Sequence, residues 1–81
     1  MTVATGAVVH PAAISTNQAL AMARADIHSA VNSDTGHQRT QYALSARDSA
    51  AEVLLEPGST PLERSYAAYY FEEADTIIAQ G

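Results

Sequence analysis

The sequence predicts a small all-α protein, an antiparallel three-helix domain preceded by a flexible N-terminal arm. Three observations predict this fold. The chain has 81 residues, which is enough for a single domain. Apolar residues recur at helical spacing in three successive segments, and no segment alternates with the period of a strand. Short runs of turn-forming residues at 32–36 and 56–59 separate the segments, which is typical of antiparallel neighbours.

The N-terminal arm is expected over residues 1–13. These residues are small and largely apolar, and Gly6 and Pro11 interrupt them. The end of a chain is ordered only where other parts of the protein hold it, so a flexible arm is the default expectation. The helical domain is then expected over residues 14–81.

The first helix is predicted over about 15–32. Either Ser15 or Thr16 can cap it, because a hydroxyl oxygen can accept from the free N–H groups of the first turn. Asn, Ser, Asp and Gly at 32–36 favour a turn after it. Its expected core stripe follows the 3.6-residue period and comprises Thr16, Leu20, Ala23, Ile27, Ala30 and Val31.

The second helix is predicted over about 38–56. Pro57 cannot continue the helical hydrogen bonds, and Gly58 tolerates the positive φ at which helices often end. The expected core stripe is rich in alanine, which allows close helix approach but buries little area. It comprises Ala43, Ala46, Ala50, Val53 and Leu54, with Leu44, Ala51 and Leu55 widening one side.

The third helix is predicted over about 60–79 and has the strongest start signal of the three. Thr60, Pro61 and Glu63 occupy the N-cap, N1 and N3 positions of a capping box. The expected core stripe comprises Ala67, Tyr70, Phe71, Ala74, Ile77 and Ile78, with Tyr66 on its boundary.

Charge is unevenly distributed along the chain, whose net charge is −5. Residues 1–47 hold three arginines and two acids, whereas residues 48–81 hold one arginine and seven acids. This acidic half disfavours nucleic-acid binding, which depends on Lys and Arg, and suits a basic protein surface. Arg24 and Arg47 lie at the margins of the stripes, so we expect an Arg–Glu63 pair between helices or arginines facing a partner.

The composition also indicates where the protein works. No stretch approaches the roughly 20 apolar residues that a membrane span needs, and the first residues lack the basic start of a signal peptide. The absence of cysteine fits a reducing cytoplasm. Arginine without lysine, together with abundant alanine, suggests a GC-rich bacterial or phage genome.

No pattern in the sequence predicts catalysis, so we expect no enzyme activity, catalytic residue, cofactor or metal. There is no cysteine nucleophile and no glycine-rich phosphate loop. His28, Asp34 and His37 surround one turn and form the one arrangement that could suit a metal, but solvated turn residues explain them more simply.

The third helix carries the residues that the core does not explain. Tyr69 projects about 140° from the centre of its stripe at 100° per residue. Leu62, Tyr66 and Tyr69 therefore form a strip that suits an interface, with Glu72, Glu73 and Asp75 as an acidic rim. The sequence predicts a protein–protein interaction or assembly module, with a homodimer as its simplest form. The alternative is an inhibitor or decoy, possibly phage-encoded, whose acidic half blocks a basic surface of a target protein.

Overall fold

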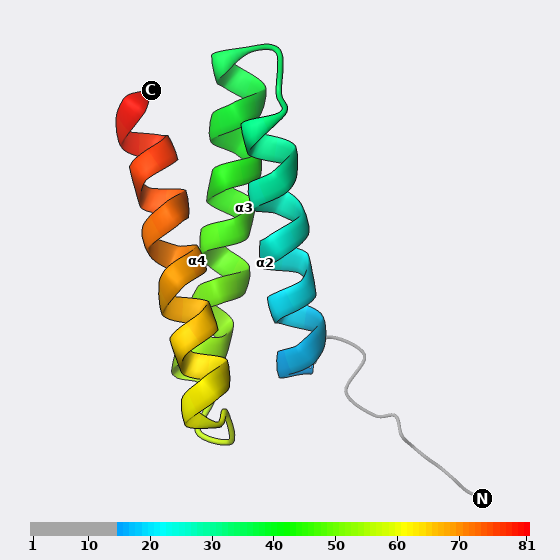
Figure 1. Cartoon of the computed structure of the whole chain (residues 1–81), viewed down its shortest axis with the longest axis vertical. Coiled ribbons are helices and arrows are strands. Elements are labelled where there is room, and N and C mark those ends of the chain that lie inside the picture. Colours follow the sequence, from blue (N-terminus) through cyan, green and yellow to red (C-terminus); the bar gives the residue numbers. More distant parts are fainter. Residues whose placement is uncertain (1–14) are drawn as a thin grey trace, which may run out of the picture.

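A computed structural model describes residues 15–81, which form three α-helices: α2 spans Thr16–Val31, α3 spans Gly36–Leu55 and α4 spans Pro61–Gln80. The helices alternate in direction, so α2 and α4 run the same way and α3 runs against both (Figure 1). α3 contacts α2 and α4 more extensively than these two contact each other. The predicted antiparallel three-helix fold is therefore confirmed, while the arm expected at 1–13 lies outside the described residues.

Hydroxyl side chains cap all three helix starts. Ser15 accepts from the Gln18 N–H of α2, and Thr35 accepts from the Gln38 N–H of α3. α3 begins two residues before the predicted start at 38, because Thr35 supplies a cap that the sequence analysis did not identify. In addition, α3 ends at Leu55 and α4 at Gln80, within one residue of their predicted ends.

The predicted capping box of α4 is confirmed. The Glu63 N–H donates to Thr60 Oγ1 at 3.1 Å, and the Thr60 N–H donates to Glu63 Oε1 at 2.8 Å. Pro61 occupies the first helical position, as expected. This local arrangement satisfies two backbone donors that would otherwise lack partners at the helix start.

The turn between α3 and α4 is held by hydrogen bonds and not by a left-handed glycine. Gly58 does not adopt the positive φ that the sequence suggested. Its N–H donates to Glu56 Oε2 at 3.0 Å instead. The buried Ser59 hydroxyl donates to the Val53 carbonyl at 2.7 Å, and Arg64 donates to the Glu56 carbonyl at 3.0 Å. These contacts satisfy carbonyls that the end of α3 leaves free.

The core is a seam of alanines. Eight alanines and one valine make up the buried apolar residues, and Val53 is the largest side chain that is fully buried. Small side chains let the helix backbones approach closely, so larger side chains lie at the margins of the seam. The buried apolar residues are Ala19, Ala23, Ala30, Ala43, Ala46, Ala50, Val53, Ala67 and Ala74.

The larger apolar residues pack against this seam but remain partly exposed. They form two groups, one with Leu20, Leu54, Tyr70 and Phe71, and the other with Ile27, Ile77 and Ile78. Two predictions were wrong here, because Val31 is 66% exposed and Leu55 is 82% exposed. Each is the last residue of its helix. Three buried positions were also missed, Ala19, Ser49 and Ser59.

None of the three described helices has the combination of length and apolar character that crossing a membrane requires.

Candidate interaction surface

The first half of α4 presents three large exposed side chains. Leu62 is 63% exposed, Tyr66 51% and Tyr69 59%. The Tyr69 ring stands edge-on to the ring of Tyr70, with centroids 5.7 Å apart and an interplanar angle of 65°. Tyr70 in turn packs on the buried cluster that includes Ala67. Tyr69 is thus partly fixed on the surface, which lowers the entropy that a contact with another chain would cost.

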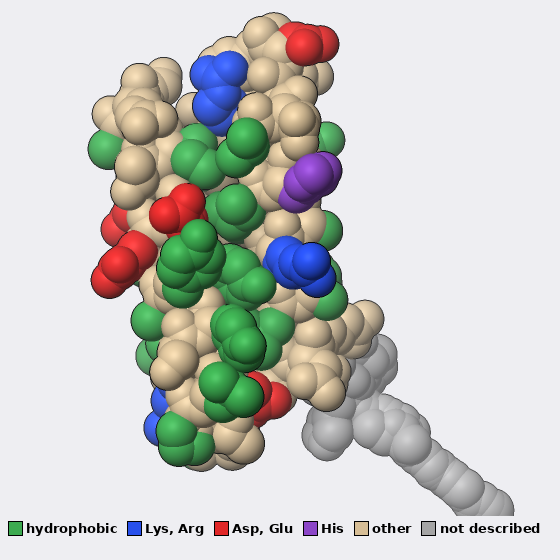
Figure 2. All heavy atoms as spheres, in the orientation of Figure 1, with side chains coloured by type: hydrophobic (Ala, Val, Ile, Leu, Met, Phe, Trp, Pro, Cys, Tyr) green, Lys and Arg blue, Asp and Glu red, His purple; other side chains and the backbone are tan. Residues whose placement is uncertain are grey.

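A groove lies between α2 and α4 beside these residues. Its walls are Leu20, Ala21 and Arg24 from α2 and Tyr66 and Tyr70 from α4, and they enclose a hollow of about 380 Å³. Figure 2 shows apolar side chains gathered in a band along this face, between α4 and α2. Tyr66 belongs to both the exposed strip and the groove. The two features therefore form one continuous surface.

Of the residues that line this groove, the sequence predicted Tyr66 as an interface residue and Arg24 as one that could face a partner, whereas Tyr70 was assigned to the core. Leu20 was assigned to the core and Arg24 to its margin. The available signal was the four-residue spacing of Leu20 and Arg24, which matches that of Tyr66 and Tyr70 and places each pair on one side of its helix. That signal becomes informative only once α2 and α4 are known to be neighbours.

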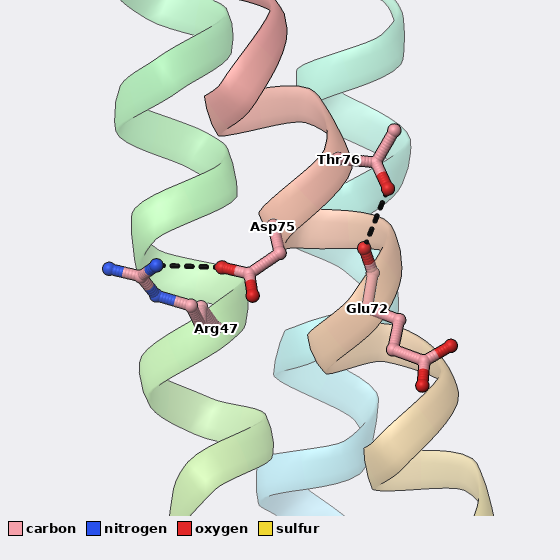
Figure 3. A network of polar contacts seen from close by, with 4 residues as sticks. All are labelled: Arg47, Glu72, Asp75 and Thr76. Atoms are coloured by element: carbon pink, nitrogen blue, oxygen red, sulfur yellow. Dashed lines mark hydrogen bonds and ion pairs between the residues drawn. The ribbon is translucent and has the colours of Figure 1, made fainter.

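The three acids predicted to form one rim differ in their surroundings. Asp75 points toward α3, where its Oδ1 accepts from Arg47 Nη1 at 2.7 Å (Figure 3). The Glu72 side chain extends away from α3 in the same view. At 100° per residue, Glu73 lies within about 20° of Tyr66 around the helix axis, whereas Glu72 lies about 120° away. Glu72 and Glu73 follow Tyr69 by three and four residues, so both lie near Tyr69, but only Glu73 lies on the same side of α4 as Tyr66.

The arginines differ in how their charges are used. The expected Arg–Glu63 pair is absent from residues 15–81, where Arg47–Asp75 is the ion pair that forms. Arg39 donates to the Ser33 carbonyl, and Arg64 donates to the carbonyls of the α3–α4 turn. Arg24 makes no ion pair or side-chain hydrogen bond within that same part of the chain, and it lines the groove.

Glu63 connects α4 to α2 at the lower end of the groove. Its Oε2 accepts from the Thr16 hydroxyl at 2.8 Å while its Oε1 completes the capping box. The Thr60 N–H and the Thr16 hydroxyl both stabilise the charged carboxylate, so they hold the pKa of Glu63 below its ordinary value of 4.5. This contact fixes the relative register of the two helices.

The two described histidines, His28 and His37, line different hollows, and His28 shares one of its hollows with Ala21 and Arg24 of the groove. His28 and Asp34 line a shallow polar hollow at the α2–α3 turn, whereas His37 lines a different one beside Asp26. Residues 15–81 contain no group of three or more His, Cys, Asp or Glu side chains placed to hold a metal ion. The geometry thus keeps His28 and Asp34 together and separates His37 from them.

Comparison with protein-family models, with curated proteins and with solved structures found no match. The fold and surface define a class all the same: a small three-helix protein with an alanine seam and a partly open aromatic groove. Its function has to be argued from that surface.

Proposed function

We propose that this protein is a protein–protein association module that binds a second copy of itself through Leu62, Tyr66 and Tyr69 and carries out no catalysis. The observation that supports this proposal is the division of side chains by size. Alanine occupies the seam, while the aromatic and large aliphatic side chains remain on an open face. Single exposed apolar residues are ordinary in monomeric proteins, but a band joined to a groove is typical of an interface.

The energy available to such an interface is considerable for a chain of this size. Tyrosine buries about 150–250 Å² when fully enclosed, and Tyr69 is 59% exposed. Covering it removes about 120 Å² from water, which is worth at most about 3 kcal/mol at 25 cal/mol per Å². A side chain that contributes half of this changes a dissociation constant by about tenfold.

The proposal predicts that solution molar mass rises with concentration for the natural chain. Tyr69→Ala should weaken this association by about tenfold or more, for the reason just given. Tyr42→Ala is the matched control, because Tyr42 is a 42% exposed tyrosine on α3, away from the groove. Light scattering or sedimentation across a dilution series measures both. A chain that stays monomeric into the millimolar range would refute self-association, and equal effects of the two substitutions would refute the role of the strip.

A second candidate function is an inhibitor that covers a basic surface of a target protein. Its support is the charge of residues 48–81, where seven acids accompany one arginine. The pairing of Asp75 with Arg47 partly neutralises the charge of one of those acids. Binding of this kind depends strongly on salt. Raising NaCl from 0.05 to about 0.5 M should therefore abolish it while leaving an association based on the tyrosine strip largely intact.

A further inference from the structure

The two edges of the groove carry opposite charge. Arg24 of α2 lines one wall. Glu73 of α4 lies on the same side of its helix as Tyr66 on the other wall, two turns or about 10 Å further along and within about 20° around the helix axis. This asymmetry constrains how a second copy can lie on the face.

The two charges also lie at nearly the same height. The Thr16 hydroxyl lies 2.8 Å from Glu63 Oε2, so these two residues mark a common level at the lower ends of α2 and α4. The two helices run in the same direction (Figure 1). Arg24 is eight residues beyond Thr16, which is about 12 Å along α2 at 1.5 Å per residue. Glu73 is ten residues beyond Glu63, about 15 Å along α4. Arg24 and Glu73 therefore lie at about the same height on opposite edges of the groove.

Neither charge is neutralised within the described part of the chain. The ion pair found in residues 15–81 joins Arg47 to Asp75, so Arg24 and Glu73 do not pair with each other. Both remain available to groups on another molecule.

The two-fold axis of a symmetric dimer through this face lies in the plane of the face, and its two limiting directions are along the helices and across them. If the axis runs along the helices, each α2 faces the other copy's α4 at the same height, and Arg24 faces Glu73 twice. If the axis runs across the helices, α2 faces α2 and α4 faces α4. Arg24 then has no opposite charge facing it, and like charges approach each other where the axis crosses near the height of Arg24 and Glu73, which disfavours that arrangement.

We propose that a second copy covers the α2–α4 groove about a two-fold axis parallel to the helices, with Arg24 of each copy opposite Glu73 of the other. This inference rests on the self-association proposed above and adds the occupant's orientation and the residues that select it. Tyr66 and Tyr69 supply contact area in this arrangement, while the two Arg24–Glu73 contacts at the edges select the orientation.

Charge reversal tests the arrangement. Arg24→Glu and Glu73→Arg should each weaken self-association by about tenfold, because each turns two attractive contacts into repulsive ones. Glu73→Arg is the more diagnostic variant. It reduces the net negative charge from −5 to −3 by adding two positive units. Two copies would then repel each other less overall, so an effect of net charge alone would strengthen association. Glu52→Arg is its matched control. It makes the same charge change at an exposed residue of α3 that does not line the groove, so it should leave association unweakened.

Mixing the two single variants gives the decisive result. In a dimer of one chain of each kind, both edge contacts again join opposite charges, so the mixture should associate as tightly as the natural chain. The double variant Arg24→Glu/Glu73→Arg should recover as well. Sedimentation of each variant alone and of the equimolar mixture measures this. If the natural chain associates but the single variants are unchanged, or the mixture fails to recover, the arrangement is wrong while self-association stands. A monomeric natural chain would overturn both.

Discussion

The alanine seam makes a quantitative prediction about stability. Ala67 is fully buried on α4 and packs in a cluster with Ala23, Ala50 and Val53. Ala68, the next residue along the same helix, is exposed. Replacing each in turn by leucine applies one chemical change inside and outside the seam. Intrinsic helix preference hardly distinguishes alanine from leucine, so the two variants differ mainly in the space around the new side chain.

The sign of the effect at position 67 depends on the room that the seam offers. Leucine adds three carbons, and burying them without strain would stabilise the fold by about 2.4 kcal/mol. Close packing against Ala23 and Ala50 leaves no such room, and overfilling a packed core costs about 1–3 kcal/mol. We therefore expect Ala67→Leu to lower the free energy of unfolding by about 1–3 kcal/mol. Ala68→Leu should change it by less than about 0.5 kcal/mol.

Urea unfolding followed by far-ultraviolet circular dichroism measures both variants. The chain concentration has to be the same throughout, because association stabilises the folded form. The midpoint should fall for Ala67→Leu with an unchanged dependence on urea, which shows that the folded and unfolded states expose similar surfaces. If Ala67→Leu is as stable as the natural chain or more so, the seam is not closely packed. The explanation for the exposed aromatic side chains then fails.

Three further predictions concern polar groups. The pKa of Glu63 is lowered in the folded protein, so the stability that its carboxylate contributes is complete above the ordinary pKa of 4.5 and is lost as pH falls through the folded-state pKa. In urea titrations, the stability difference between the natural chain and Glu63→Gln should therefore shrink as pH falls below 4.5. Asp75→Asn should cost less than about 1 kcal/mol, and less still in 1 M NaCl, since the side chains of Arg47 and Asp75 are 35% and 52% exposed. Ser49 is buried and its hydroxyl makes no hydrogen bond within residues 15–81. Ser49→Ala should therefore raise the free energy of unfolding by up to about 1 kcal/mol and raise the thermal midpoint with it. A lower midpoint would contradict this.

Local sequence signals predicted most of the helical architecture. The capping box at Thr60 and Glu63 depends on residues three apart, so the sequence contains all of its determinants. The stripes of α3 and α4 were also predicted, because helical periodicity decides which side of a helix is apolar. Val31 and Leu55 were wrongly assigned to the core, because helical periodicity shows which side of a helix is apolar but not where the neighbouring helices end. Both residues lie at helix ends, where they remain largely exposed.

The candidate surface was less predictable, because it depends on how the helices are rotated and aligned. The direction of Asp75 around α4 follows from the sequence, but its partner Arg47 lies 28 residues earlier and meets it only through the packing of α3 on α4. The groove similarly requires α2 and α4 to be parallel neighbours. The contact between Thr16 and Glu63, 47 residues apart, sets their register.

The alanine seam connects stability to association. Small side chains bring the helices close together but bury little apolar area each, so the seam contributes only modestly to folding. The side chains with the most area, including Tyr70 and Ile77, lie at the seam's edges and are only partly covered. Covering them with a second copy would add burial that a domain of this size cannot obtain alone. The thermal midpoint of the natural chain should then rise with concentration, whereas that of Tyr69→Ala should rise less over the same range.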